Sequence, residues 1–310
     1  MTRAWAAEMG RIELKSLEQV KWMREAGLVV ADIHRSLREA ARPGITTREL
    51  DAVSAQAIRR AGATSNFLNY AGYPATVCIS INDVVVHGIP GERTLEEGDL
   101  VSFDCGAWVS RNGREWHGDA AFSMIVGDEW IPDEEFAQGK RAMGAAPGGL
   151  SDERIRRRRE LDAVTRESLW AALANLEGAR RVSAVGAAVE DVVALNADEL
   201  GWEAGIIEEY TGHGIGTAMH QEPEILNYNA RGISAKLKPG MVLAVEPMLT
   251  AGGIETFTED DEWTVRTCDG SDAAHWEHTV AILSEGISVL TAPDFGKAGL
   301  AAFGVVPVEL

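Results

Sequence analysis

Two histidines, His213 and His220, stand in the glycine-rich stretch 209–220. Glycines at 212, 214 and 216 surround the first histidine. Such a run suits neither a helix interior nor a well-packed strand, because glycine loses more backbone entropy on folding than any other residue. A single histidine is more often an ordinary core or surface residue than a ligand. Two histidines in one glycine-rich stretch favour close approach of the backbone to a bound group.

Four carboxylates, Asp104, Asp119, Glu246 and Glu277, fall within apolar, strand-like runs. A carboxylate on the inward face of such a strand is costly to bury unless it is paired or bound to a metal. Clustered with His213, the four would repel one another unless cations neutralised them. Oxygen ligands with one nitrogen suit Mn, Fe, Co or Zn, and bridging carboxylates hold two ions about 3.5–4 Å apart. Because a metal pair lowers the pKa of a shared water, the set predicts a hydrolase.

The elements that must position these residues can be read from periodicity. Capping boxes at Ser16 and Thr46 open two helices, over about 16–41 and 46–60, and helical spacing returns over about 160–175 and 183–199. β-Branched and alternating runs predict strands over 76–81, 84–89, 100–109 and 117–126, with 275–282 as another strand-like run. A turn signal at 111–114 joins the third and fourth of these strands into a hairpin, which can bring Asp104 and Asp119 face to face.

An internal repeat organises the chain. The segment Leu95–Asp104 aligns without gaps with Leu237–Glu246, matching leucine with leucine and Gly98 with Gly240, and each copy ends in a carboxylate. Each follows a helix pair, so the repeat predicts a pseudo-two-fold α+β domain in which Asp104 and Glu246 converge on the symmetry axis. The alternative is chance recurrence of a short turn-plus-strand pattern.

Composition restricts the function classes. The chain has 310 residues, 45% of them hydrophobic, and a net charge of −19, which disfavours bulk attraction to nucleic acid or an anionic membrane. Three cysteines without paired spacing argue against a disulfide framework. The N-terminus does not read as an export signal and no long apolar run reads as a membrane span, so we expect a cytoplasmic protein. The arginine run 154–159 is interpreted as a solvated helix face rather than a docking site for RNA.

Five motifs together resemble a known family. They are Ser80–Pro90, Gly212–Gly216, His220–Pro223, Leu237–Met241 and Val245–Met248. In order and spacing they are similar to type I methionine aminopeptidases of the short bacterial form, which have the "pita-bread" metallopeptidase fold. The resemblance implies a central antiparallel sheet with two helix pairs covering one face.

The likeness covers residues 15–288 and implies a single catalytic domain. We expect pseudo-repeats over 15–127 and 160–288, a connecting segment over 128–159, an N-terminal extension over 1–14 and a C-terminal tail over 289–310.

The resemblance also implies roles for site residues. The metal ligands would be Asp104, Asp119, His213, Glu246 and Glu277, with Asp119 and Glu277 bridging two divalent ions (Co, Mn, Fe or Zn). A metal-bridging hydroxide would attack the first peptide carbonyl, with Glu246 helping to deprotonate the water. His220 would hydrogen-bond the carbonyl oxygen, and His87 would interact with the scissile nitrogen.

A methionine pocket follows from the same resemblance. The residues at its lining positions, with His87 and His220 beside them, are Phe67, Tyr70, Tyr73, Cys78, Met219 and Trp263. Physically these form an apolar, polarizable sleeve for a thioether, although each aromatic alone could be ordinary core. The implied substrates are peptides and nascent chains with an N-terminal methionine and a small second residue. Transient ribosome contact through 128–159 is possible within this scheme, and a monomer is the default.

Departures from the family pattern and rival functions are also apparent. The span from Asp104 to Asp119 is longer than usual, which we interpret as a loop extended at the hairpin tip; an insertion inside the ladder would flip the side-chain face. Rival readings are a prolidase or X-Pro aminopeptidase, a metal-free pseudoenzyme that acts as a binding protein, and a creatinase-like hydrolase. Metal analysis distinguishes the pseudoenzyme from the peptidases, and substrate choice distinguishes the peptidases from one another.

Overall fold

The computed structural model describes residues 11–140, 152–232 and 234–310. Its helices in these ranges are α1 (Leu17–Ala40), α2 (Thr47–Ala61), α3 (Asp133–Ala137), α4 (Asp152–Asn175), α5 (Ala184–Leu200) and α6 (Lys297–Leu300), with short 3₁₀ turns η2 (Tyr70–Gly72) and η3 (Ala301–Phe303). The four longest correspond to the four helices predicted from sequence, although α4 begins earlier than predicted. Both capping boxes form, since the Ser16 and Thr46 side chains accept from the backbone three residues on.

The strands are short except for one long hairpin. They are β1 (Thr64–Ser65), β2 (Val77–Ile81), β3 (Val84–Val86), β4 (Leu100–Arg111), β5 (Arg114–Ile125), β6 (Gly205–Ile206), β7 (Gly212–Gly214), β8 (Gln221–Ile225), β9 (Val242–Val245), β10 (Met248–Thr250), β11 (Thr256–Thr258), β12 (Val265–Thr267), β13 (Ala273–His275), β14 (His278–Ile282) and β15 (Ile287–Val289). The expected run 275–282 is therefore broken at Trp276 and Glu277.

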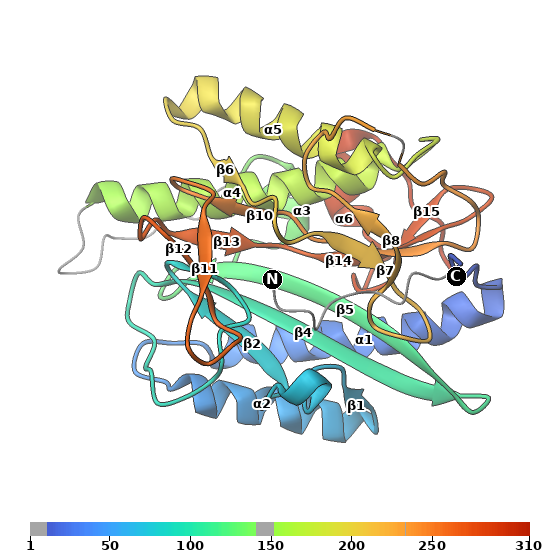
Figure 1. The fold of residues 1–310 in the computed structure, drawn as a ribbon, viewed down its shortest axis with the longest axis horizontal. Helices are drawn as coiled ribbons and strands as arrows, with labels where there is room; N and C mark the ends of the chain where they lie inside the picture. The colour runs from blue at the N-terminus through green and yellow to red at the C-terminus, as the bar shows by residue number, and fades with distance from the viewer. Residues whose placement is uncertain (1–10, 141–151, 233) are drawn as a thin grey trace.

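Two antiparallel sheets form the centre of the molecule (Figure 1). In one, β4 lies between β2 and β5; in the other, β9 lies between β7 and β14. The two sheets meet where Ala121 of β5 and Glu277 exchange backbone hydrogen bonds of 3.3 and 2.9 Å. Next to them, the Thr279 hydroxyl donates to the Asp119 carbonyl at 2.7 Å. The halves thus share one hydrogen-bonded seam.

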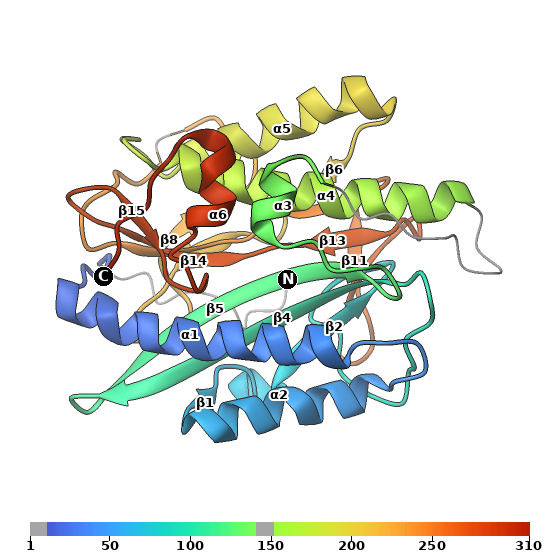
Figure 2. The same cartoon turned by 180° about the vertical axis from the view of Figure 1, so that it is seen from behind.

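Helices cover the face of these sheets that is toward the viewer in Figure 2. Helix α1 packs on β4 and β5 with α2 beside it, while α4 packs on β13 and β10 and carries α5 on its outer side. The predicted α+β architecture with two helix pairs on one face is confirmed. Within the described residues, no helix has the length and apolar character needed to cross a bilayer.

The long hairpin differs from the prediction at its tip. Strands β4 and β5 pair in unbroken register from Leu100 opposite Ile125 to Arg111 opposite Arg114. The turn is only Asn112 and Gly113, both with positive φ (51° and 70°), as a tight two-residue hairpin turn requires. The expected extended loop is wrong: the residues around Trp108 to Glu115 lengthen both strands, and the regular register leaves the side-chain faces unchanged.

The arginine run is also not a uniformly solvated face. Helix α4 begins at Asp152 rather than near residue 160, so the whole run is helical. Arg158 is 2% exposed and pairs with Asp272 through two bonds of 3.0 and 2.9 Å. A buried guanidinium of this kind needs its carboxylate partner, because desolvation alone would be strongly unfavourable.

The final segment, 289–310, packs on the domain. The Arg24 guanidinium of α1 donates to the backbone carbonyls of Leu290 (2.7 Å) and Pro293 (2.6 Å). Leu300 at the end of α6 is fully buried. These contacts join the tail to the helical layer.

A buried contact of α4 yields a stability prediction. The Trp276 indole donates to Asp162 at 2.7 Å, and burial raises the pKa of Asp162 from 3.8 to about 7. Because the folded pKa is the higher one, Asp162 favours folding below pH 3.8 and this contribution is lost as the pH rises through 7. Asp162→Asn keeps an acceptor and does not titrate. We expect it to raise the free energy of unfolding at pH 8 by on the order of 2 kcal/mol, allowing for the half-buried site.

The measurement is urea unfolding of both proteins at pH 8 and pH 4.5. The gain in free energy of unfolding of Asp162→Asn over the wild type should be much smaller at pH 4.5. At that pH Asp162 is protonated in the folded protein, so less of the cost of burying its charge remains. An equal advantage at both pH values would show that Asp162 does not titrate as inferred.

Candidate metal centre

The seam between the two sheets forms the base of a cavity of about 730 Å³. Every site residue predicted from sequence lines it except Met219: the lining includes Phe67, Tyr70, Tyr73, Cys78, His87, Asp104, Asp119, His213, His220, Glu246, Trp263 and Glu277. Met219 is buried in the apolar cluster of Phe67, Tyr73 and Cys78, so it supports the wall without forming the surface. The fold therefore brings together residues as distant in sequence as 67 and 277.

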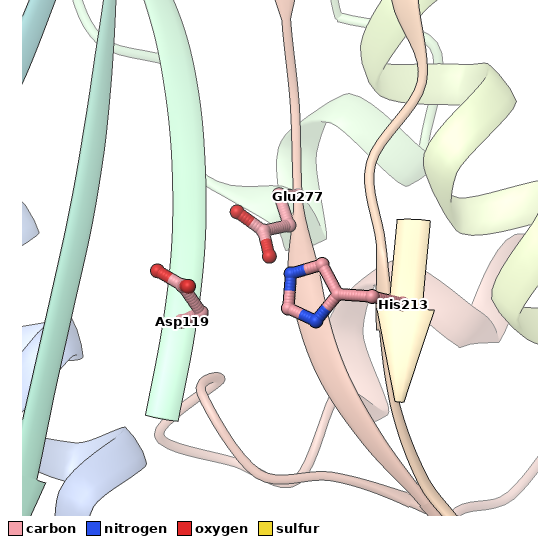
Figure 3. A group of neighbouring side chains, drawn as sticks. All are labelled: Asp119, His213 and Glu277. Atoms are coloured by element: carbon pink, nitrogen blue, oxygen red, sulfur yellow. The ribbon is translucent and has the colours of Figure 1, made fainter. Parts of the chain in front are cut away.

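The hairpin register places Asp104 and Asp119 on one face. Asp104 pairs with Ala121, and Asp119 lies two residues from Ala121 on the same strand. Side chains alternate along a strand, so both carboxylates project to the same side. The other half brings Glu277 from the seam and His213 from β7, and Figure 3 shows these two side chains pointing toward Asp119. One ligand atom from each of the three lies within 4.8 Å of the others.

Among the described residues that line the cavity with these carboxylates there is no lysine or arginine. Burial raises the pKa of Asp104 to about 7. Burial and the neighbouring negative charges raise the pKa values of Asp119, Glu246 and Glu277 well above their ordinary range. One oxygen each of Asp104, Asp119 and Glu277 is buried with no hydrogen-bond partner. Oxygen atoms orphaned in this way fit a site for divalent cations, and those of Asp119 and Glu277 belong to the close group with His213.

His213 is oriented to join this group. Its Nδ1 lies 2.9 Å from the Gly214 carbonyl, and a donor there leaves Nε2 with its lone pair free. That Nε2 is 3.5 Å from the Glu246 carboxylate. Burial lowers the pKa of His213 to about 4, so the imidazole is neutral at pH 7, the form that binds metals.

Two further histidines face the same space. His220 stacks edge-on to His213 with 4.4 Å between ring centroids, and its Nδ1 lies 2.9 Å from the Tyr70 hydroxyl. His87 has a φ of 61°, which is uncommon for a residue with a side chain. Its ring packs edge-on against Trp263 at 6.1 Å between centroids. Burial lowers the pKa of His87 to about 4 and that of His220 well below its ordinary value.

Beyond these polar groups the cavity becomes apolar. Tyr73 meets both Phe67 (6.4 Å between centroids) and Trp263 (5.1 Å) in edge-to-face geometry. The Tyr73 hydroxyl donates to the Gly88 carbonyl at 2.9 Å, which satisfies its polar atom and leaves its ring to the cavity. Buried Cys78 adds a polarizable sulfur. One end of the cavity is therefore acidic and the other aromatic.

His275 is a cavity residue that the sequence analysis did not assign. Its Nε2 is buried without a hydrogen-bond partner and lies 3.8 Å from the Glu246 carboxylate. A signal was present, because His275 precedes Glu277 by two residues and side chains two apart share a face along a strand. His278, in the same run, instead has its Nδ1 2.8 Å from the Thr291 hydroxyl.

The chain matches known proteins over most of its length. Residues 21–284 match the model of metallopeptidase family M24. Methionine aminopeptidase 1 of Mycobacterium tuberculosis is 43% identical over 278 residues, which cover 89% of this chain and 94% of that protein. The crystal structure of the Thermotoga maritima methionine aminopeptidase superposes with a TM-score of 0.75 at 33% identity, covering 91% of this chain and 99% of that one. The resemblance inferred from sequence is confirmed.

A more distant structure shares the fold alone. The prolidase from Pyrococcus furiosus has a TM-score of 0.61 at 18% identity and matches 90% of this chain but 65% of its own. The pita-bread fold expected from the motifs is thereby confirmed.

Metal loading should be visible in thermal stability. Removing metal with a chelator leaves the buried carboxylates without counter-charges, so adding Mn or Co to the stripped protein should raise its Tm. At 100 times the Kd the gain is about 2.7 kcal/mol, or a shift on the order of 5 °C. Asp119→Asn removes one repelling carboxylate, and we expect the stripped variant to be at least as stable as the stripped wild type but to lose most of the metal-induced shift.

Differential scanning calorimetry with and without metal makes the test, with Glu115→Gln as control. Glu115 lies on β5 and is exposed. The control should keep the full shift. An Asp119→Asn protein that responds to metal like the wild type would show that the ion binds elsewhere.

Proposed function

The chain belongs to metallopeptidase family M24, and from this premise we propose that it removes the N-terminal methionine from proteins and peptides whose second residue is small. The observation that carries the proposal is the two-ended cavity. Its acidic end has the groups that peptide hydrolysis needs, and its aromatic end fits a thioether side chain. The methionine aminopeptidases similar to this chain carry that activity in their names.

We propose that five residues hold two divalent ions, with Asp119 and Glu277 shared between the two. The full ligand set is Asp104, Asp119, His213, Glu246 and Glu277, and its oxygen-rich composition with one nitrogen suits Co, Mn, Fe or Zn. Such ions supply Lewis acidity and lower the pKa of bound water, the activation that an ordinary peptide bond requires.

Glu246 is the best placed residue to take the proton from the attacking water. Its two oxygens face His213 at 3.5 Å and His275 at 3.8 Å, so imidazoles border it on two sides. Burial raises its pKa, which gives a carboxylate more basic than one in water.

His220 supports the scissile carbonyl oxygen as negative charge develops on it. When the Tyr70 hydroxyl donates to Nδ1, the proton of the neutral ring is on Nε2, which then donates into the cavity. A preorganised donor of this kind stabilises the transition state more than the ground state. His87, also neutral at pH 7, interacts with the scissile nitrogen as the amine departs.

The methionine side chain occupies the aromatic end. Phe67, Tyr73 and Trp263 present ring edges and faces at right angles, and a thioether makes favourable contacts with both. Tyr70, Cys78 and the supporting Met219 complete a soft, adaptable wall. We further propose that the substrates are nascent chains in the cytoplasm and that the protein acts as a monomer. A transient ribosome contact within 128–159 would include residues 141–151, which lie outside the described part of the chain.

Peptide choice tests the activity. The purified protein with Mn or Co should release methionine from Met-Ala-Ser but not from Met-Lys-Ser, because the proposed preference is for a small second residue beside the metal ligands. Release should stop when a chelator is added and return with metal. An Ala-Pro peptide is the comparison substrate: cleavage of it in place of the methionine peptide would move the assignment to the X-Pro peptidases of the same fold.

Substitutions test the assigned roles. Glu246→Gln removes the proton acceptor and one ligand charge, so kcat should fall by about 10³-fold or more. His220→Ala removes one transition-state donor, so kcat should fall by about 10²–10³-fold with a smaller change in KM. Steady-state kinetics on Met-Ala-Ser, with metal content measured for each protein, separates the two effects. A His220→Ala protein that lost only affinity would place His220 in ground-state binding.

A further inference from the structure

The segment just before α1 lies against the loop that carries His220. We call residues 11–15 the strap and residues 216–221 the His220 loop. One Glu13 oxygen, Oε1, accepts from the Thr217 hydroxyl at 3.0 Å. The other, Oε2, accepts from the Thr217 backbone N–H at 3.1 Å and from the Gln221 amide at 2.9 Å. A single carboxylate thus holds the loop on both sides of His220.

Lys15 strengthens the same contact. Its ammonium donates to the Gln221 side-chain oxygen and to the Glu13 carbonyl, both at 3.1 Å, and its side chain is 2% exposed. Its backbone N–H donates to the Gly240 carbonyl at 2.7 Å. Burial lowers the pKa of Lys15 to about 8 against the opposing charge of Glu13. The buried ammonium therefore depends on Glu13 and Gln221 as its hydrogen-bond partners.

Two glycines make room for the strap. A Cβ at Gly216 would come within 2.3 Å of both the Glu13 carboxylate and the Lys15 side chain. A Cβ at Gly240, which has a φ of 92°, would come within 2.6 Å of the Lys15 carbonyl. Gly216 is the third glycine of the stretch around His213. A side chain at Gly216 would therefore displace the ends of the Glu13 and Lys15 side chains from their present contacts.

His220 itself belongs to no helix or strand, because it lies between the end of β7 at Gly214 and the start of β8 at Gln221. Its ring position depends on the loop backbone and on Tyr70. We propose that Glu13 and Lys15 are positioning residues that hold the His220 loop, and through it the His220 imidazole, in the geometry needed for catalysis. The proposal rests on the proposed function in that it takes the role of His220 from there.

Double-variant kinetics is the first test. A misplacement of about 1 Å can cost as much as about 10²-fold in rate, so Glu13→Ala should lower kcat on Met-Ala-Ser by about 10-fold or more with little change in KM. In a His220→Ala background the same substitution should change kcat by less than about 2-fold, because its effect passes through His220. Exposed Glu18 in the first turn of α1 provides the control, and Glu18→Ala should leave kcat unchanged.

A more conservative substitution tests the proposal if Glu13→Ala does not fold. Thr217→Val keeps the shape of the side chain and removes the hydroxyl that donates to Glu13 and accepts from the Gln221 amide at 3.3 Å. The backbone bond from Thr217 to Glu13 remains, so the variant should lower kcat in the same direction by a smaller factor. Equal losses for Glu13→Ala with and without His220 would overturn the proposal and leave the strap a general stabilising contact.

Nuclear magnetic resonance of histidine-labelled protein provides a readout that needs no turnover. Glu13→Ala should shift the ring signals of His220, identified by their loss in His220→Ala, and leave those of His34 unchanged. His34 is buried on α1, with Nε2 3.0 Å from the Ala120 carbonyl. Unmoved His220 signals would overturn the positioning role. An inactive wild type with shifted His220 signals would instead overturn the proposed function alone.

Discussion

The structure depends on keeping four carboxylates close together in one cavity. Each buried charge costs several kcal/mol unless a cation or a donor compensates it. The carboxylates must therefore be held by elements that cannot relax apart. The hairpin β4–β5, with its unbroken register, holds Asp104 and Asp119, and the seam of backbone bonds between Ala121 and Glu277 fixes the second half against the first. Divalent ions are the compensation that suits such a rigid set of oxygens.

The two copies of the internal repeat use equivalent positions for different side chains. Ser102 of the first copy is equivalent to Ala244 of the second, and their neighbours across the ladder are Ser80 and His213. In the second half this neighbouring position holds the imidazole of His213, which faces the carboxylates. The first half uses it for a hydroxyl that accepts from Gly88, next to the positive-φ residue His87. Equivalent positions thus hold a proposed metal ligand in one half and support the turn that carries His87 in the other.

The features that could be predicted from sequence are those that neighbouring residues determine. The capping boxes at Ser16 and Thr46 and the alternation along β4 and β5 need no distant partner, and they were read correctly. Asp272, the partner of Arg158, lies 114 residues away, so nothing near the arginine run indicates that one of its members is buried. The strap was missed for the same reason, since Glu13 contacts residues more than 200 positions later. The five metal-site residues stood out by type, but their roles came from resemblance to a family.

Burial acts in opposite directions on the two kinds of group in the cavity. It raises the pKa values of the carboxylates, so without cations they tend to hold protons. It lowers the pKa values of His87 and His220, so these rings stay neutral. Cations displace the protons from the carboxylates because the ligands must be deprotonated to bind them. Cations do not favour a charged form of the His87 and His220 imidazoles. A neutral ring has one N–H donor and one acceptor nitrogen. One cavity can therefore supply anionic ligands and neutral hydrogen-bond donors side by side, provided that each ring is held in a single orientation by a neighbour such as Tyr70.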